Sequence, residues 1–163
     1  MKLTAKQYIA IAFLIALILF TGYYRDYLFK NINAVIQSKQ YNEQYTTLPS
    51  SLYFLNSFGF QTLVNLKWLL TIVFSAVYLI LSLLTLKIIF DKRRYYLITS
   101  GVYLTLILIS GMFILTGYLF NGISDRMYEF ARYLMGMAQS PIILMILIPA
   151  FKLSRPEHNH NTN

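Results

Sequence analysis

The stretch WLLTIVFSAVYLILSLLTL, residues 68–86, holds nineteen residues and no charged side chain, between Lys67 and Lys87. An α-helix rises about 1.5 Å per residue, so about 20 apolar residues cross a ~30 Å hydrocarbon layer. Buried helices of soluble proteins seldom run so long without a polar stripe. The stretch therefore predicts a membrane-spanning helix.

The composition of the whole chain agrees with this prediction. Of 163 residues, 57% are hydrophobic and 12% are charged, against about 25% charged in soluble proteins. The net charge of +8 comes from Lys and Arg placed between apolar runs, which favours contact with lipid headgroups over nucleic acid. The chain contains no cysteine, which excludes a cysteine nucleophile and cysteine metal ligands.

Uncharged runs predict four spans, at about 7–24, 63–90, 95–120 and 128–151. The expected fold class is all-α, an integral membrane four-helix bundle in one membrane domain, residues 1–153. The first run follows a basic start, as in a signal peptide, but its end lacks a small-x-small cleavage site. We therefore expect a retained first helix. The polar tail, residues 154–163, is expected to be disordered and cytoplasmic.

Apolar residues recur at helical spacing just after the first span, which predicts an amphipathic helix at about 25–38. It either lies in the membrane interface or extends the first helix beyond the bilayer. It opens an outer loop, residues 25–62, that is rich in Tyr and Phe. So many rings predict that the loop rests on the membrane or on a neighbouring protein.

Orientation follows from the Lys and Arg residues near the span ends. With four spans, the side that holds both termini carries eight Lys and Arg residues, and the opposite side carries six. The densest cluster, Lys92, Arg93 and Arg94, lies on the side of the termini. Basic residues concentrate on the cytoplasmic side. We therefore expect a bacterial inner-membrane protein with both termini in the cytoplasm.

No set of residues predicts an enzyme. The uncharged runs contain no Asp, Glu, Lys, Arg or His, one of which a proton-coupled transporter usually needs within the bilayer. The two histidines, His158 and His160, lie in the tail and do not predict a metal site. We expect no catalytic residues, no metal and no cofactor.

Two stretches place an arginine among aromatic residues at the outer boundary, YYRDY at 23–27 and EFARYLMG at 129–136. Arg25 or Arg132 could pair with Asp26 or Glu129, or hold an anionic group. The favoured interpretation is that both reach lipid phosphates beside an aromatic belt.

The polar sequence Gln139-Ser140-Pro141 interrupts the last apolar run. Pro141 lacks the N–H that would bond to the carbonyl of Met137, and its ring clashes with that carbonyl, so a kink is expected. Gln139 could hydrogen-bond to a neighbouring helix or to the carbonyls that Pro141 leaves free.

Three segments resemble the small exosortase-associated membrane proteins of Gram-negative bacteria: YYRDYLFKNINAVI at 23–36, NLKWLLTIVFS at 65–75 and ARYLMGMAQSPIILMILIPAFKL at 131–153. The resemblance implies partnership with a membrane transpeptidase that cuts sorting tags from exported proteins. An exosortase uses Cys, Arg and His, so this chain, without cysteine, is not that enzyme. Five matching residues are candidates for a contact surface: Arg25, Arg132, Gln139, Ser140 and Pro141.

The sequence and the resemblance together lead to two alternative functions. The first is a non-enzymatic accessory protein of an exosortase-type sorting or envelope-assembly system, which docks to the transpeptidase. The alternative is a small independent transporter or lipid-handling protein, possibly a homodimer, in which the arginine sites grip lipid headgroups. The alternative requires a polar cavity that reaches Gln139.

Overall fold

The computed structural model describes residues 4–41, 48–90, 92–119 and 124–154, with the side chains at 117–119, 124–126 and 128 left aside. These residues form helices and no strands, which confirms the all-α class. The elements in chain order are α1 (Ala5–Tyr41), η1 (Ser50–Ser57, a 3-10 helix), α2 (Phe60–Phe90), α3 (Arg93–Leu119), α4 (Ser124–Ala138) and α5 (Ile142–Leu153). Residues 155–163 of the expected disordered tail and residues 42–47 of the outer loop lie outside the described residues.

The first span and the amphipathic segment that follows it form one helix, α1. α1 continues for 37 residues without a break, about 55 Å at 1.5 Å per residue. No proline lies within it, and its single glycine, Gly22, is tolerated in a helix interior. The segment 25–38 is therefore an extension of the first helix, the second of the two alternatives.

Within the described residues, three helices are long and apolar enough to cross a membrane, at Ala5–Tyr41, Phe60–Phe90 and Arg93–Thr116. A fourth crossing exists only if Glu129–Ala138 and Ile142–Leu153 count as one span, because the two helices are bent by 58° at their break. These helices are compatible with a multi-pass membrane protein. The expected fourth span, 128–151, is thus a broken pair, bent where the kink at Pro141 was expected.

The break between α4 and α5 has a local cause at Pro141. Proline cannot donate to the carbonyl four residues earlier, which is that of Met137. Ser140 takes over this carbonyl, through its N–H at 3.2 Å and its hydroxyl at 2.9 Å. α5 then restarts from Pro141, whose carbonyl accepts the N–H of Met145.

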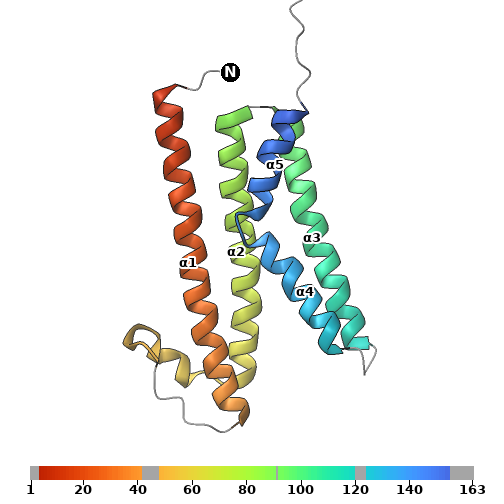
Figure 1. Cartoon of the computed structure of the whole chain (residues 1–163). Helices are drawn as coiled ribbons and strands as arrows, with labels where there is room; N and C mark the ends of the chain where they lie inside the picture. The colour runs from red at the N-terminus through yellow and green to blue at the C-terminus, as the bar shows by residue number, and fades with distance from the viewer. Residues whose placement is uncertain (1–3, 42–47, 91, 120–123, 155–163) are drawn as a thin grey trace, which may run out of the picture.

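The broken pair nevertheless runs the length of α3 in the opposite direction (Figure 1). Near the end of α3, the rings of Phe113 and Phe130 lie 4.9 Å apart. Near its start, the rings of Tyr95 and Phe151 lie 4.5 Å apart. α5 thus ends beside the α2–α3 junction, at the same end of the molecule as the start of α1 (Figure 1).

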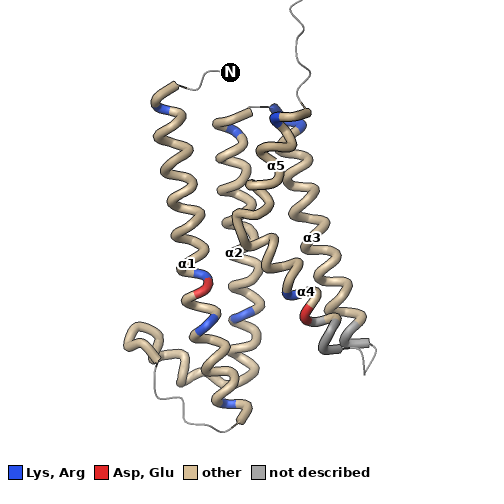
Figure 2. Tube along the Cα trace, viewed as in Figure 1, with Lys and Arg blue, Asp and Glu red and all other residues tan. Residues whose placement is uncertain are grey.

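Two buried clusters hold the helices together. The larger joins α1, α2, α3 and α5 around Tyr78 and Tyr103. The smaller joins the extension of α1 to η1 and the start of α2, around Val35 and Leu63. Charged residues among those described lie in one group at the end where α1 begins and α5 ends, and in another lower on the helices (Figure 2).

Candidate functional site

Three cations from different helices stand at corresponding positions. Arg25, Lys67 and Arg132 each border one uncharged run, at 7–24, 68–86 and 133–151, and the runs have eighteen, nineteen and nineteen residues. The opposite ends of these runs are also basic, at Lys6, Lys87 and Lys152. The three helical segments therefore have nearly equal apolar lengths and carry one cation at each end.

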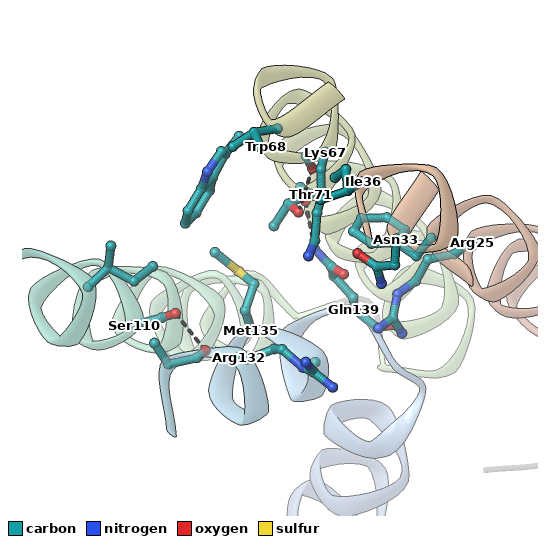
Figure 3. A pocket seen from close by; sticks show the side chains of 15 residues that line it. Arg25, Asn33, Ile36, Lys67, Trp68, Thr71, Ser110, Arg132, Met135 and Gln139 are labelled. Atoms are coloured by element: carbon teal, nitrogen blue, oxygen red, sulfur yellow. Dashed lines mark hydrogen bonds between the residues drawn. The ribbon is translucent and has the colours of Figure 1, made fainter. Parts of the chain in front are cut away.

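Arg25, Lys67 and Arg132 line one partly open cavity of about 340 Å³ between α1, α2, α3 and α4 (Figure 3). Its wall is otherwise mainly apolar and aromatic. The remaining lining residues are Phe29, Asn33, Ile36, Val64, Trp68, Thr71, Ser110, Ile114, Ala131, Met135, Gly136 and Gln139. We call this cavity the cationic pocket.

Arg25 is held on one side of the cationic pocket. Its Nη1 donates a hydrogen bond of 2.9 Å to the main-chain carbonyl of Gln139, and its guanidinium lies 5.9 Å from the ring centre of Phe29. Its Nε is buried and has no hydrogen-bond partner among the described residues. Because a guanidinium has five N–H groups, Arg25 retains donors for a ligand.

The Gln139 side chain forms the inner wall of the cationic pocket and is 3% exposed. Its Nε2 donates to the main-chain carbonyl of Thr71 at 2.7 Å and to the hydroxyl of Ser75 at 3.1 Å. The amide thus bonds across to α2, one of the two expected arrangements. This contact and that of Arg25 fix the break of α4 and α5 to two other helices.

Carboxylates are scarce around the cationic pocket. No Asp or Glu lines it among the described residues. Asp26 Oδ1 lies 3.7 Å from Arg25 Nη1, but the Asp26 side chain is 76% exposed. Glu129 is exposed and forms no ion pair with Arg25 or Arg132 within 4 Å. The positive charge of the pocket is therefore only partly compensated by the protein.

Between Gln139 and the end of α2, buried hydroxyl groups are bonded to one another or to backbone. The hydroxyls of Ser82 and Tyr103 lie 2.8 Å apart, and the Tyr78 hydroxyl donates to the carbonyl of Ile18 at 3.4 Å. All three side chains are buried. These contacts join α1, α2 and α3 between the cationic pocket and the other end of the molecule.

Comparison with protein-family models, with curated proteins and with solved structures finds no match to this chain. In the described part of the chain, no three His, Cys, Asp or Glu residues gather as a metal site would require. Two guanidinium groups and one ammonium group are suited to bind a phosphate or carboxylate.

The structure brings some of the candidate residues together and leaves others apart. Arg25, Arg132 and Gln139 share the cationic pocket, whereas Ser140 and Pro141 form the break beside it. Lys92, Arg93 and Arg94 are exposed at the α2–α3 junction, at the other end of α2. Lys67 and Trp68 were not among the residues predicted from the sequence. The available signal was the position of Lys67, which directly precedes the uncharged run 68–86.

Proposed function

We propose that this chain is a non-catalytic, multi-pass membrane protein that holds the anionic headgroup of a membrane lipid in the cationic pocket. The observation that carries the proposal is the convergence of Arg25, Lys67 and Arg132 on one cavity that no described carboxylate lines. Like charges gathered in one cavity repel one another, and a bound anion offsets this repulsion.

The position of the cationic pocket favours a lipid as the source of the anion. If the uncharged runs lie in the hydrocarbon layer, Lys67 and Arg132 border it at the headgroup level, and Arg25 reaches inward to Gln139. The pocket also offers exposed indole and phenyl surface at Trp68 and Phe29, which suits the glycerol and upper acyl region. A volume of about 340 Å³ is at the small end of ligand sites and suits a headgroup.

Transport across the membrane is less well supported. Gln139 lies seven residues beyond Arg132, so the cationic pocket extends only about 10 Å inward at 1.5 Å per residue. The buried hydroxyl contacts of Ser82 with Tyr103 lie beyond it. This arrangement supports holding a lipid at one face of the membrane.

The test is lipid binding to the purified protein in phosphatidylcholine nanodiscs that contain an anionic phospholipid. Lys67→Met and Arg132→Met should each weaken binding by about tenfold or more, because a charge-assisted hydrogen bond contributes about 1.5–3 kcal/mol. Lys30→Met is the matched control, since Lys30 is exposed on the same end of α1 but does not line the pocket. Equal effects of all three variants would refute a specific site.

The resemblance to exosortase-associated proteins supports a second proposal, an accessory subunit that docks to a membrane transpeptidase. Large aromatic side chains of η1 and α4 are exposed, among them Tyr53 at 67% and Tyr133 at 75%. Such rings are frequent in protein interfaces. Co-expression with an exosortase-type transpeptidase should give co-purification in mild detergent that Tyr53→Ala and Tyr133→Ala abolish. Co-purification that both variants leave unchanged would reject this surface.

We also propose a bacterial inner-membrane location with both termini in the cytoplasm. The start of α1 and the end of α5 lie at one end of the molecule (Figure 1), and Lys92, Arg93 and Arg94 belong to that end. Basic loops remain on the cytoplasmic side. The cationic pocket then opens toward the outer leaflet.

A further inference from the structure

The cationic pocket carries more positive charge than a common phospholipid headgroup can neutralise. Arg25, Lys67 and Arg132 contribute three positive charges, and the exposed Asp26 beside Arg25 offsets at most one of them. A phosphodiester headgroup such as that of phosphatidylglycerol carries a single negative charge. A phosphomonoester carries about −1.5 to −2 at pH 7, which matches the remaining charge.

The donors of the cationic pocket also fit a phosphate with more than two free oxygens. The cations come from α1, α2 and α4, so they approach a ligand from separate directions. Arg25 uses Nη1 for its hydrogen bond to Gln139, and its guanidinium has further N–H groups, which bind phosphate oxygens in pairs. A terminal phosphate presents three unesterified oxygens, whereas a phosphodiester presents two.

We infer that the ligand of the cationic pocket is a lipid that ends in a phosphomonoester or a diphosphate, with at least two negative charges. This inference rests on the proposed function and names the class of headgroup. Arg25, Lys67 and Arg132 hold the free phosphate oxygens, and Trp68 lies against the adjoining apolar part of the lipid.

The single tryptophan makes the inference directly measurable. Trp68 is the only Trp in the chain and lines the cationic pocket, so its fluorescence reports occupancy of the pocket. The protein in phosphatidylcholine nanodiscs is titrated with phosphatidic acid or with phosphatidylglycerol of the same acyl chains. Phosphatidic acid should bind about tenfold more tightly, because it makes at least one more charge-assisted hydrogen bond.

Variants then show whether the preference belongs to the cationic pocket. Lys67→Met and Arg132→Met should reduce the preference for phosphatidic acid to less than about threefold, since one fewer cation faces the phosphate. Lys30→Met should leave the preference unchanged. Thermal unfolding of each variant confirms that it is folded.

A soluble competitor distinguishes a lipid from free phosphate. Glycerol 3-phosphate and inorganic phosphate carry the same phosphate group without acyl chains, and should compete at least about a hundredfold more weakly if the lipid chain contributes. If the soluble phosphates compete at concentrations equal to that of the lipid, the ligand is a soluble phosphate compound and the inference of a lipid is wrong.

The possible failures are separable. If phosphatidylglycerol and phosphatidic acid bind equally, and both depend on Lys67 and Arg132, the class of headgroup is wrong while the proposed function stands. If neither lipid depends on Lys67 or Arg132 more than on Lys30, both the class and the proposed function are refuted.

Discussion

Arg25 caps the broken helix from a position 114 residues earlier in the chain, by donating from Nη1 to the carbonyl of Gln139 at 2.9 Å. The last carbonyls of a helix lack intrahelical partners and carry partial negative charge. Gln139 follows the last residue of α4, so a cation is favourable there. One arginine thus stabilises the break and also lines the cationic pocket.

Removing this cap should destabilise the fold. Arg25→Met is expected to lower the free energy of unfolding by about 1.5–3 kcal/mol, the usual contribution of a hydrogen bond with a charged partner. Lys30→Met, on the exposed side of the same helix, should change it by less than about 0.5 kcal/mol. Chemical unfolding in detergent micelles, followed by Trp68 fluorescence, measures both. Similar values for the two variants would show that the Gln139 contact adds no stability.

Gly22 is required by the close approach of α1 and α2. A Cβ at this position would lie 2.8 Å from the hydroxyl oxygen of Tyr78, and Tyr78 is 1% exposed. Gly22→Ala should therefore cost about 1–3 kcal/mol through overpacking. The second substitution Tyr78→Phe removes the clashing oxygen and should restore most of the loss.

Gly101→Ala is the control for this prediction. Nothing lies within 4 Å of a Cβ built there, and alanine favours a helix over glycine by about 1 kcal/mol. Thermal unfolding should rank Gly101→Ala at or above the native chain and Gly22→Ala below it. Failure of Tyr78→Phe to rescue Gly22→Ala would contradict the proposed clash.

The buried hydroxyl pair of Ser82 and Tyr103 joins α2 to α3, with the two oxygens 2.8 Å apart. Tyr103→Phe leaves Ser82 without its interhelical partner and should cost about 1–3 kcal/mol. The double variant with Ser82→Ala should be less destabilised than the sum of the two single variants, because both polar groups are then absent. Thr105→Ala is the control, since Thr105 is exposed and its hydroxyl donates to the carbonyl of Gly101 in its own helix. An additive double variant would show that the two hydroxyls are not coupled.

Labelling of single introduced cysteines tests the orientation of the protein in the membrane. The native chain contains no cysteine, so no native cysteine has to be removed first. Ser50→Cys, in η1, should react with a membrane-impermeant maleimide in intact bacterial spheroplasts. Arg93→Cys, at the start of α3, should react only after permeabilisation. Both residues are exposed, so access to the reagent depends on the membrane. The opposite pattern would place the cationic pocket in the inner leaflet.

Local properties of the sequence were sufficient for the all-α class. The length and the apolar composition of an uncharged run such as 68–86 can be counted in the sequence. Together they predict a helix able to span a membrane. The kink near Pro141 followed equally from the residue itself, because the missing N–H is a property of proline. The continuity of α1 was not determined, since amphipathic spacing at 25–38 is the same in a separate helix and in an extension.

The candidate site was recoverable only in part. The arginines and Gln139 were visible as polar residues beside apolar runs, but nothing local linked Lys67 to them. Which side chains meet across helices depends on how each helix is rotated and how closely its neighbours approach, and small differences in packing change both. The sequence thus set the lengths of the apolar segments and the cations at their ends, whereas packing of α1, α2 and α4 brought three of those cations into one cavity.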